Sequence, residues 1–599
     1  MGWLRWDRRA HYFLNYLFRI TIQAMTSRFA QWLRDPLFLL CLTAGLLAFV
    51  VQSGELGTSD TAHRLQTTHW LWTSEPQVFP NEYPEFGLHG RGGRLYSWYG
   101  IGQSLLMLPS DLLGTWIAHW SIFSDYEDDP AVRSIVASYS TSILVDVLTA
   151  LIAFRFLRQL RFGMKESVAG VLALMFCTTH LHYTQNMMEN NYILLLTLTG
   201  FSFQYECLRT GSRRALFWGS CALGLNLLTR LTTGMDLIAA GIFVLLVLWF
   251  GGRVSEEAAK EVVPDQELRP QGLKPHSEQS GYRSGEPLRH PKPTASSSFS
   301  VRGDGGRGFR LWRRLLVYCK VAAPVYAFFL LADRAYQFYR FGSFTNTYVT
   351  IFSREFRQRD PTLPANFPWS TPFHTGVLGA LFRPEKSIFL FDPVLVLAIF
   401  LLAWLWKRLT PEVRAYGVTS LLLLLAYICF YARYTYWSGD FAWGDRYVST
   451  AVELVTLVAV PLLMRYREVL GRTVCFGGWA LIAVSLTIQL ASLAFWLPLE
   501  IYQMETLGHP TFVIALRFKN IVAFALGKMD AWGLNTEAMN WDPWDHVHVT
   551  TWNFLPFVLR RVGAAPGWVA NTALAIWLAG IAALGAALRL LHNSLRAVA

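Results

Sequence analysis

Long apolar runs recur along the chain from residue 36 to residue 590, and they constrain the fold more than any motif does. A transmembrane helix needs about 20 predominantly apolar residues. The chain of 599 residues is 53% hydrophobic and only 16% charged, whereas soluble domains carry about 25% charged residues. The runs therefore predict an all-α polytopic membrane protein and exclude an ordinary soluble one.

Dividing the runs by apolar length predicts about twelve transmembrane helices. They fall at 36–52, 133–155, 166–185, 190–208, 214–230, 232–250, 315–333, 388–406, 415–433, 448–464, 473–496 and 568–590. The apolar run 101–120 is not counted, because a crossing there would move the basic segment 155–165 to the outer side. We expect it to be a helix that lies at the outer face.

Basic residues orient these helices, since loops on the cytoplasmic side carry an excess of Lys and Arg. Three joints between successive runs are basic, at 209–214, 407–414 and 465–472. This places both termini inside. It also accounts for the net charge of +12 without nucleic acid as a partner.

The same division predicts the domain organisation. A basic cytoplasmic interfacial segment (1–35) precedes an N-terminal transmembrane module (36–250) with its first outer loop at 53–132, and a C-terminal module (313–599) carries outer loops at 334–387 and 497–567. Between the modules, 251–312 is rich in Gly, Pro, Ser and alternating charge. Such a composition buries too little apolar surface to offset chain entropy, so it predicts a disordered cytoplasmic linker.

Two carboxylates, Glu55 and Asp60, stand in the stretch SGELGTSDTAHRL (53–65), directly after the first apolar run. They emerge at a membrane surface where charge is scarce, which makes them candidates for chemistry. An Asp that precedes a helical run is also an ordinary N-cap. The two roles of Asp60 are compatible.

Several further segments are rich in aromatic and charged residues and recur in a suggestive order. They are SDTAHRLQTTHWLW (59–72), LHGRGGRLYSWYGIGQSLL (88–106), DPAVRSIVASYSTSIL (129–144), GLNLLTRLTTGMD (224–236), YRFGSFTNTY (339–348), GALFRPEKSIFLFDP (379–393) and WGDRY (443–447). Taken together, these segments resemble the GT-C superfamily of membrane glycosyltransferases, which includes protein mannosyltransferases and lipid A aminoarabinose transferases. The resemblance implies helices of the GT-C type with jaw helices at the outer face and long extracytoplasmic loops.

The resemblance also implies a function. Members use a polyprenyl-phosphate-linked sugar donor and transfer the sugar to an acceptor, which can be a lipid, a glycan or a protein. The expected location is a bacterial inner (cytoplasmic) membrane with the site outside and membrane lipids as further partners. Inversion by single displacement is the expected stereochemical course.

Two departures from the family bear on donor binding. The family's jaw segment often carries a Lys near a Pro pair, whereas YSWYG (96–100) has neither. Arg383 and Lys386 stand in LFRPEK where relatives more often have small residues. Tyr99, within YSWYG, is included among the candidates for substrate binding.

Glycosyl transfer from a lipid phosphate to a hydroxyl needs a carboxylate for the acceptor proton and cations for the departing phosphate. Asp60 is the expected base and Glu55 the second choice. The cations predicted to lie outside are Arg340, Arg383, Lys386 and Arg446. Each of them can instead snorkel or bind anionic headgroups.

Arg230 is another candidate for phosphate binding, at the short joint LLTRLTT (227–233). A charge at membrane depth is costly without a partner, so we expect it to pair with Asp236 or with a carboxylate of the first outer loop. The acidic segments DYEDDP (125–130) and MMENN (187–191) can be solvated surfaces or can bind a cation or the acceptor. We predict no metal site and no cofactor.

An alternative function is a transporter or flippase of a lipid-linked or amphipathic substrate. Such a protein would show matching halves with broken helices and a polar site at the midplane. The polar residues here lie mainly in loops on one side, and Asp146 and Asp236 are too few to indicate a proton relay. A catalytically silent scaffold is a third alternative.

Overall fold

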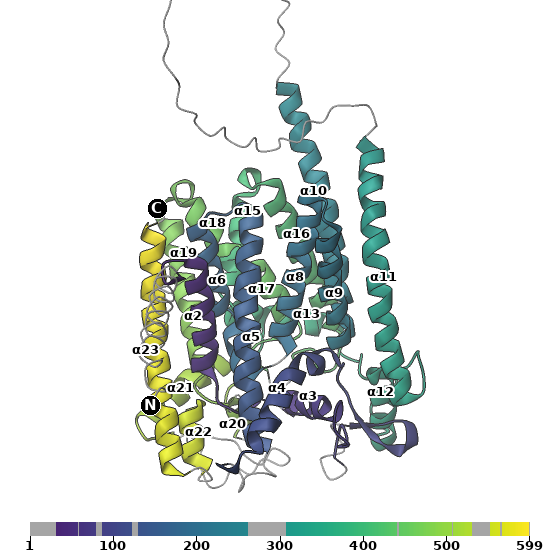
Figure 1. Cartoon of the computed structure of the whole chain (residues 1–599), viewed down its shortest axis with the longest axis vertical. Coiled ribbons are helices and arrows are strands. Elements are labelled where there is room, and N and C mark those ends of the chain that lie inside the picture. Colours follow the sequence, from purple (N-terminus) through teal and green to yellow (C-terminus); the bar gives the residue numbers. More distant parts are fainter. Residues whose placement is uncertain are drawn as a thin grey trace, which may run out of the picture.

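The computed structural model describes residues 32–57, 59–79, 87–122, 130–187, 189–261, 307–439, 442–496, 498–505, 507–529, 552–562 and 566–597. This part of the chain is mostly helical. Long helices run side by side along one axis (Figure 1). The predicted class, a mostly helical membrane protein, is confirmed.

The first half of the chain forms eleven helices or helical turns and one short hairpin within the described residues. They are α2 (Pro36–Val51), α3 (Ser59–Trp70), β1 (Gly87–His89), η2 (Arg91–Gly93), β2 (Leu95–Ser97), α4 (Gly102–Ala118), α5 (Pro130–Gln159), α6 (Met164–Cys177), α7 (His180–Asn186), α8 (Glu189–Thr210), α9 (Arg213–Thr229), η4 (Leu231–Thr233) and α10 (Gly234–Glu261). β1 and β2 pair antiparallel, with Leu88 opposite Tyr96.

The second half is helical wherever regular structure is described. Its elements are α11 (Arg307–Phe341), α12 (Tyr348–Arg359), α13 (Phe373–Phe382), α14 (Ile388–Phe391), α15 (Val394–Trp404), η5 (Trp406–Arg408), α16 (Pro411–Tyr431), α17 (Ser449–Thr456), α18 (Ala459–Arg465), α19 (Arg467–Ser492), α20 (Pro498–Glu505), α21 (Val513–Ala525), α22 (Leu555–Val562) and α23 (Gly567–Ala597).

Six helical segments of the described chain are long and apolar enough to cross a membrane. They are Val132–Gln159, Leu231–Gly251, Leu315–Phe341, Pro411–Tyr431, Arg467–Ser492 and Gly567–Ala597. Three shorter apolar helices are α2, α13 and α15. The number of twelve crossings stays a prediction.

Three of the apolar runs form broken helices where the sequence predicts continuous ones. The run 166–185 is divided between α6 and α7, because Thr178 has extended backbone angles. The run 388–406 is divided before Pro393, whose ring disfavours a helical conformation at the preceding residue. The run 448–464 is likewise divided between α17 and α18.

The predicted linker is too wide at both of its ends. Helix α10 continues to Glu261 and helix α11 begins at Arg307, inside the predicted range 251–312. The remaining residues, 262–306, lie outside the described residues, as do 1–31 of the N-terminal segment. The segments 334–387 and 497–567, predicted to be outer loops, contain helices, among them α12, α20 and α21.

Helix starts follow from local sequence. The side chain of Asp35 accepts a hydrogen bond from the Leu37 N–H, and Pro36 occupies the first turn of α2. Thr410 caps α16 in the same way, with Pro411 next to it. Proline suits this position because the first N–H groups of a helix have no partner within it.

The core of the bundle is aromatic where α5, α8, α10 and α16 meet. Phe156, Phe201, Phe243 and Tyr416 are fully buried, and their ring centroids lie 5.1–6.3 Å apart. The Tyr416 hydroxyl donates to the carbonyl of Leu454 at 2.6 Å, so its polar atom is also satisfied. Such packing makes this part of the bundle a rigid support.

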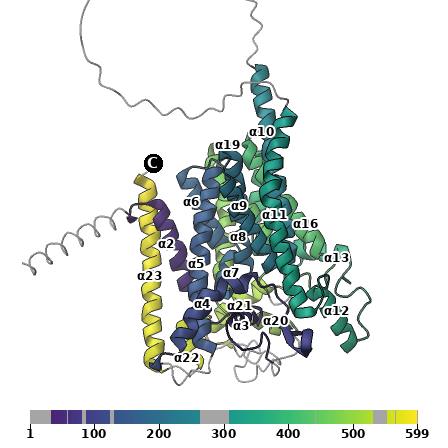
Figure 2. The same ribbon diagram turned by 45° about the vertical axis from the view of Figure 1, so that its right-hand side comes forward.

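Several of the shorter helices lie at one end of the bundle. In Figure 1, α3, α4, α12, α20 and α22 lie at the end opposite to the one from which α10 projects, and Figure 2 shows the same arrangement. The predicted helix at 101–120 is present as α4, beside α3. Helix α23 packs along α2, where the Trp577 indole donates to the carbonyl of Val50 at 2.8 Å.

Candidate functional site

Helix α3 carries the first two residues of the site. Asp60 lies in its first turn and Arg64 follows four residues later, a spacing that puts both side chains on one face. The hydroxyl of Thr61 donates to the carbonyls of Asn186 and Met187 at 3.4 and 3.3 Å. These bonds fix the start of α3 against the connection between α7 and α8.

Asp60 joins three segments that are far apart in the sequence. Its Oδ1 accepts a hydrogen bond from the Tyr99 hydroxyl at 2.5 Å, and its Oδ2 accepts one from Arg446 Nη1 at 2.6 Å. Helix α3 begins at Ser59, so Asp60 stands inside its first turn rather than before it. Both carboxylate oxygens bind side chains of other segments.

A second buried carboxylate, Glu189, lies beside this contact. It forms an ion pair with Arg64, with 2.7 Å between Arg64 Nη2 and Glu189 Oε2, and another with Arg230. The expectation that Arg230 pairs with Asp236 or with a carboxylate of the first outer loop was wrong, because Glu189 begins α8 and lies next to it. The Arg64 guanidinium lies 4.0 Å from the ring centroid of Tyr99.

These six residues form one continuous set, here called the arginine–carboxylate group. Its members are Asp60, Arg64, Tyr99, Glu189, Arg230 and Arg446. Three guanidinium charges against two carboxylate charges leave it with one net positive charge. Within the described chain, Nε and Nη1 of the buried Arg64 have no hydrogen-bond partner. An excess of positive charge with unused donors favours an anionic ligand.

Aromatic rings cover one side of the group. The guanidinium carbons of Arg230 and Arg446 each lie 5.3 Å from the ring centroid of Tyr447. The Tyr447 ring stacks on Tyr431 with 4.3 Å between centroids, and the Tyr431 hydroxyl lies 2.9 Å from that of Thr232. The two arginines are therefore held by ring faces as well as by carboxylates.

Charge controls the protonation of Asp60 and Tyr99. Burial alone would raise the pKa of Asp60, but the positive charges of Arg446 and Arg64 outweigh it and hold the pKa below its ordinary value. Burial, and next the charge of Asp60, raise the pKa of Tyr99 well above its ordinary value. At neutral pH Asp60 is thus an ionised acceptor and Tyr99 a protonated donor.

Arg446 is positioned by a well-packed loop. The preceding Trp443 is fully buried, and its carbonyl accepts a hydrogen bond from the Tyr183 hydroxyl at 3.0 Å. Lys386, another predicted cation, donates to the carbonyls of Ala442 and Gly444 at 2.7 and 3.3 Å. Lys386 therefore binds the backbone of the loop that carries Arg446.

Arg340 likewise binds the backbone of the segment that carries Tyr99. It is fully buried at the end of α11 and donates to the carbonyl of Tyr99 at 3.1 Å, to the carbonyl of Ser97 and to Gln337. These bonds hold the end of β2 and the segment that follows it. Arg340 thus orients the backbone that carries Tyr99.

For two other predicted residues, Glu55 and Arg383, the described polar contacts are to neighbours in the sequence. Glu55 lies in the turn before α3, where its backbone N–H donates to Ser53 Oγ at 3.2 Å. Arg383 follows α13, is half exposed, and lies 3.4 Å from Glu385. The direct partners of the Asp60 carboxylate are Tyr99 and Arg446.

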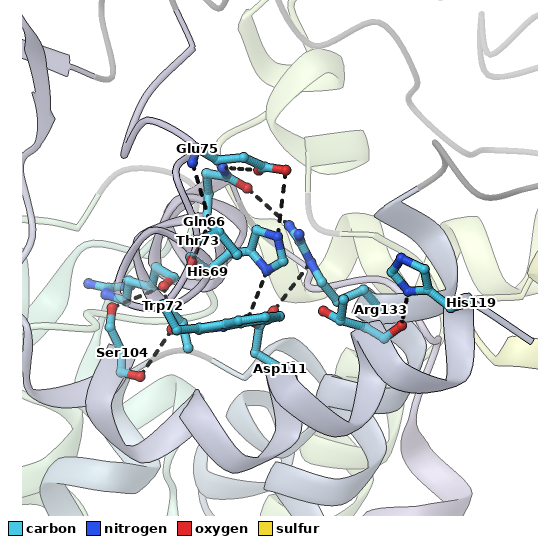
Figure 3. A network of polar contacts seen from close by, with 12 residues as sticks. Gln66, His69, Trp72, Thr73, Glu75, Ser104, Asp111, His119 and Arg133 are labelled. Carbon is cyan, nitrogen blue, oxygen red and sulfur yellow. Dashed lines mark hydrogen bonds and ion pairs between the residues drawn. The ribbon is translucent and has the colours of Figure 1, made fainter.

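A polar network fixes the other end of α3 (Figure 3). The buried Asp111 of α4 accepts hydrogen bonds from Trp72 Nε1 at 2.8 Å and from His69 Nδ1 at 3.0 Å. Arg133 Nε of α5 lies 3.3 Å from the other Asp111 oxygen. Helices α3, α4 and α5 are thereby joined, and α3 is held at both ends.

Sequence reasoning missed Arg64 and the pairing role of Glu189. The spacing of Arg64 from Asp60 on a predicted helix was a usable signal, and Glu189 stood in the segment MMENN that was considered for cation binding. Residues 125–129 of the other acidic segment lie outside the described residues. In the described ranges, no group of three or more His, Cys, Asp or Glu side chains is placed to hold a metal ion.

The geometry thus joins an ionised carboxylate to three guanidinium groups at one end of a helical bundle. This arrangement can accept a proton and can bind a phosphate. Comparison with protein-family models, curated proteins and solved structures gave no match for this chain.

Proposed function

We propose that this chain is a membrane glycosyltransferase of the GT-C type, which moves a sugar from a polyprenyl-phosphate donor to an acceptor hydroxyl at the extracytoplasmic face. The observation that carries the proposal is the contact of Asp60 with Arg446 inside a group of net positive charge. About twelve transmembrane helices and a bacterial inner membrane belong to the same proposal. The acceptor is a lipid, glycan or protein.

Asp60 acts as the general base in this reaction. The acceptor oxygen attacks the anomeric carbon, the bond from that carbon to the phosphate oxygen breaks, and its electron pair stays on the phosphate. The acceptor proton passes to Asp60. A carboxylate that is ionised at neutral pH meets the first requirement of this step.

The guanidinium groups stabilise the departing phosphate. Arg64 has two unused donors among the described residues, Nε and Nη1, and Arg230 and Arg446 belong to the same group through their ion pairs with Glu189 and Asp60. Arginine binds phosphate in bidentate fashion, and charge that develops on the phosphate gains most from donors held in place beforehand.

Binding of the donor would also activate the base. Both oxygens of Asp60 are occupied, by Tyr99 and Arg446. A phosphate that attracts the Arg446 guanidinium frees Oδ2 for the acceptor proton. Withdrawal of that positive charge also raises the pKa of Asp60, which makes it a stronger base.

Sugar transfer from a labelled polyprenyl-phosphate sugar, by the purified chain in lipid vesicles, tests the proposal. The wild type is expected to label an acceptor fraction, and Asp60→Asn is expected to lose this activity. Full activity of Asp60→Asn would overturn the role of the base. If neither protein transfers a sugar from any of a panel of donors, the proposal that the chain is a glycosyltransferase is overturned.

A transporter or flippase is the alternative, and one observation favours it. The breaks in two helical runs meet, since the Thr179 N–H between α6 and α7 donates to Asp392 between α14 and α15 at 2.7 Å. Broken helices that meet at a polar site are typical of transporters. Movement of a fluorescent lipid across vesicles, without transfer from any donor, would support this alternative.

A further inference from the structure

A second polar site lies between the β1–β2 hairpin and helix α12. An open cleft of about 580 Å³ is lined by His89, Arg354, Glu355, Gln358 and Arg359. Each of these side chains is polar or charged. None of them belongs to the arginine–carboxylate group, so the cleft is a separate feature of the same end of the molecule.

The walls of the cleft are fixed by contacts between strand and helix. Glu355 Oε1 accepts a hydrogen bond from the backbone N–H of His89 at 3.1 Å, and Oε2 lies 3.3 Å from His89 Nδ1. Beneath these polar contacts, Leu88 packs with Ile351 and Phe352 in a buried cluster. The lining of the cleft is therefore held in place by the fold, and its carboxylate, Glu355, is already bonded to His89.

The charge of the lining is positive. Arg354 is exposed and makes no hydrogen bond or ion pair within the described part of the chain, and Arg359 Nη2 lies 4.0 Å from Glu355 Oε2. Two guanidinium charges against one carboxylate leave one net positive charge. Arg91 and Arg94, both exposed at the hairpin turn, add to it. A ligand of this cleft is expected to carry a negative charge.

Both walls lead to the arginine–carboxylate group. Two residues after β2 the chain reaches Tyr99, which binds Asp60. Helix α12 begins at Tyr348, whose pKa is raised first by burial and then by Tyr447 and Tyr431, the rings beside Arg230 and Arg446. Arg354 and Arg359 follow Tyr348 by six and eleven residues, which puts them about 9 and 17 Å along the helix from Tyr348. A ligand of a few sugar units can bridge this distance.

We propose that the cleft binds the acceptor of the transfer, through a sugar that carries a phosphate or carboxylate group. This inference rests on the proposed function and adds a chemical class of acceptor to it. The negative group pairs with Arg354 and Arg359, while Gln358 and His89 offer hydrogen bonds to hydroxyl groups. The reacting hydroxyl then lies toward Asp60.

Ligand-observed saturation-transfer NMR tests the binding directly. The full chain is placed in nanodiscs of neutral phosphatidylcholine with glucose 1-phosphate as the probe. The wild type is expected to bind the probe. The double variant Arg354→Gln/Arg359→Gln is expected to bind at least about tenfold more weakly. The matched control, Lys407→Gln/Arg408→Gln, removes two exposed charges from η5 and is expected to bind like the wild type.

Three results would overturn the proposal. The first is binding of the probe by the Arg354→Gln/Arg359→Gln variant as tightly as by the wild type. The second is an affinity of the wild type for inorganic phosphate equal to its affinity for the probe, which would mean that any phosphate suffices. The third is loss of probe binding in phosphatidylglycerol nanodiscs, which would mean that the cleft takes lipid headgroups. Failure of the proposed function looks different, because it appears as absence of transfer while the binding of glucose 1-phosphate is unaffected.

Discussion

Replacing Asp60 with Asn removes the charge of the proposed base with almost no change in shape. The Asn carbonyl oxygen can still accept the Tyr99 hydroxyl, whereas the ion pair with Arg446, 2.6 Å in length, is lost. A general base contributes about 100- to 10,000-fold to the rate, so kcat is expected to fall by that range. The donor KM is expected to stay level or fall, because Arg446 is released for the phosphate.

The same substitution has a calculable cost in stability. The side chains of Asp60 and Arg446 are each 14% exposed, so their pair lies between a surface pair and a fully buried one. Loss of one partner is expected to cost about 1–3 kcal/mol, below the 3–5 kcal/mol of a fully buried pair. Thermal unfolding in detergent measures this cost, and it ensures that lost activity is not mistaken for lost fold.

Initial rates of transfer from a radiolabelled donor give kcat and KM for the variant. Asp360→Asn is the matched control, since it removes an exposed carboxylate after α12 and is expected to leave both constants unchanged. A kcat for Asp60→Asn within threefold of the wild-type value would refute the role of Asp60 as the general base. A rise in KM at constant kcat would instead assign Asp60 to ground-state binding.

Three other variants extend the account. Arg64→Met is expected to raise the donor KM at least tenfold in steady-state kinetics, with partial recovery in Arg64→Lys, and equal KM values would contradict phosphate binding. Arg446 holds the pKa of Asp60 below its ordinary value, so the kcat/KM of the wild type is expected to persist as the pH falls through the ordinary pKa of an Asp. In Arg446→Gln the pKa of Asp60 rises, so kcat/KM is expected to fall already at a higher pH than in the wild type. A pH–rate profile of both proteins measures this shift. Arg517→Met leaves the fully buried Glu500 without its ion-pair partner and with only the neutral Asn520 among its described donors, so thermal unfolding is expected to show about 3–5 kcal/mol of destabilisation; a change below 1 kcal/mol would contradict this.

The membrane class could be predicted from the sequence because apolar length is a local property. Breaks within the apolar runs were harder to predict. Pro393 was visible in the sequence, but Thr178 takes an extended conformation in a tertiary setting that periodicity does not encode. The limits of the linker were misplaced for a related reason, since α10 and α11 extend as helices beyond their apolar portions.

The members of the site were partly predictable, and their contacts were not. Asp60, Tyr99, Arg230 and Arg446 were all candidates, yet the meeting of residues 60 and 446 depends on how α3 packs against the loop before α17. A cation looks the same in sequence whether it faces a ligand or a backbone carbonyl. This is why Arg340, which binds the carbonyls of Ser97 and Tyr99, was indistinguishable from the others.

Native mass spectrometry of the full chain tests the central claim most directly. The wild type is expected to carry a lipid with the mass of a polyprenyl phosphate, with or without a sugar. Asp60→Asn is expected to retain that lipid, and Arg64→Met/Arg446→Gln to lose it, because two of the three guanidinium groups are removed. A wild type that carries phospholipid alone, or a double variant that retains the polyprenyl phosphate in full, would contradict the claim.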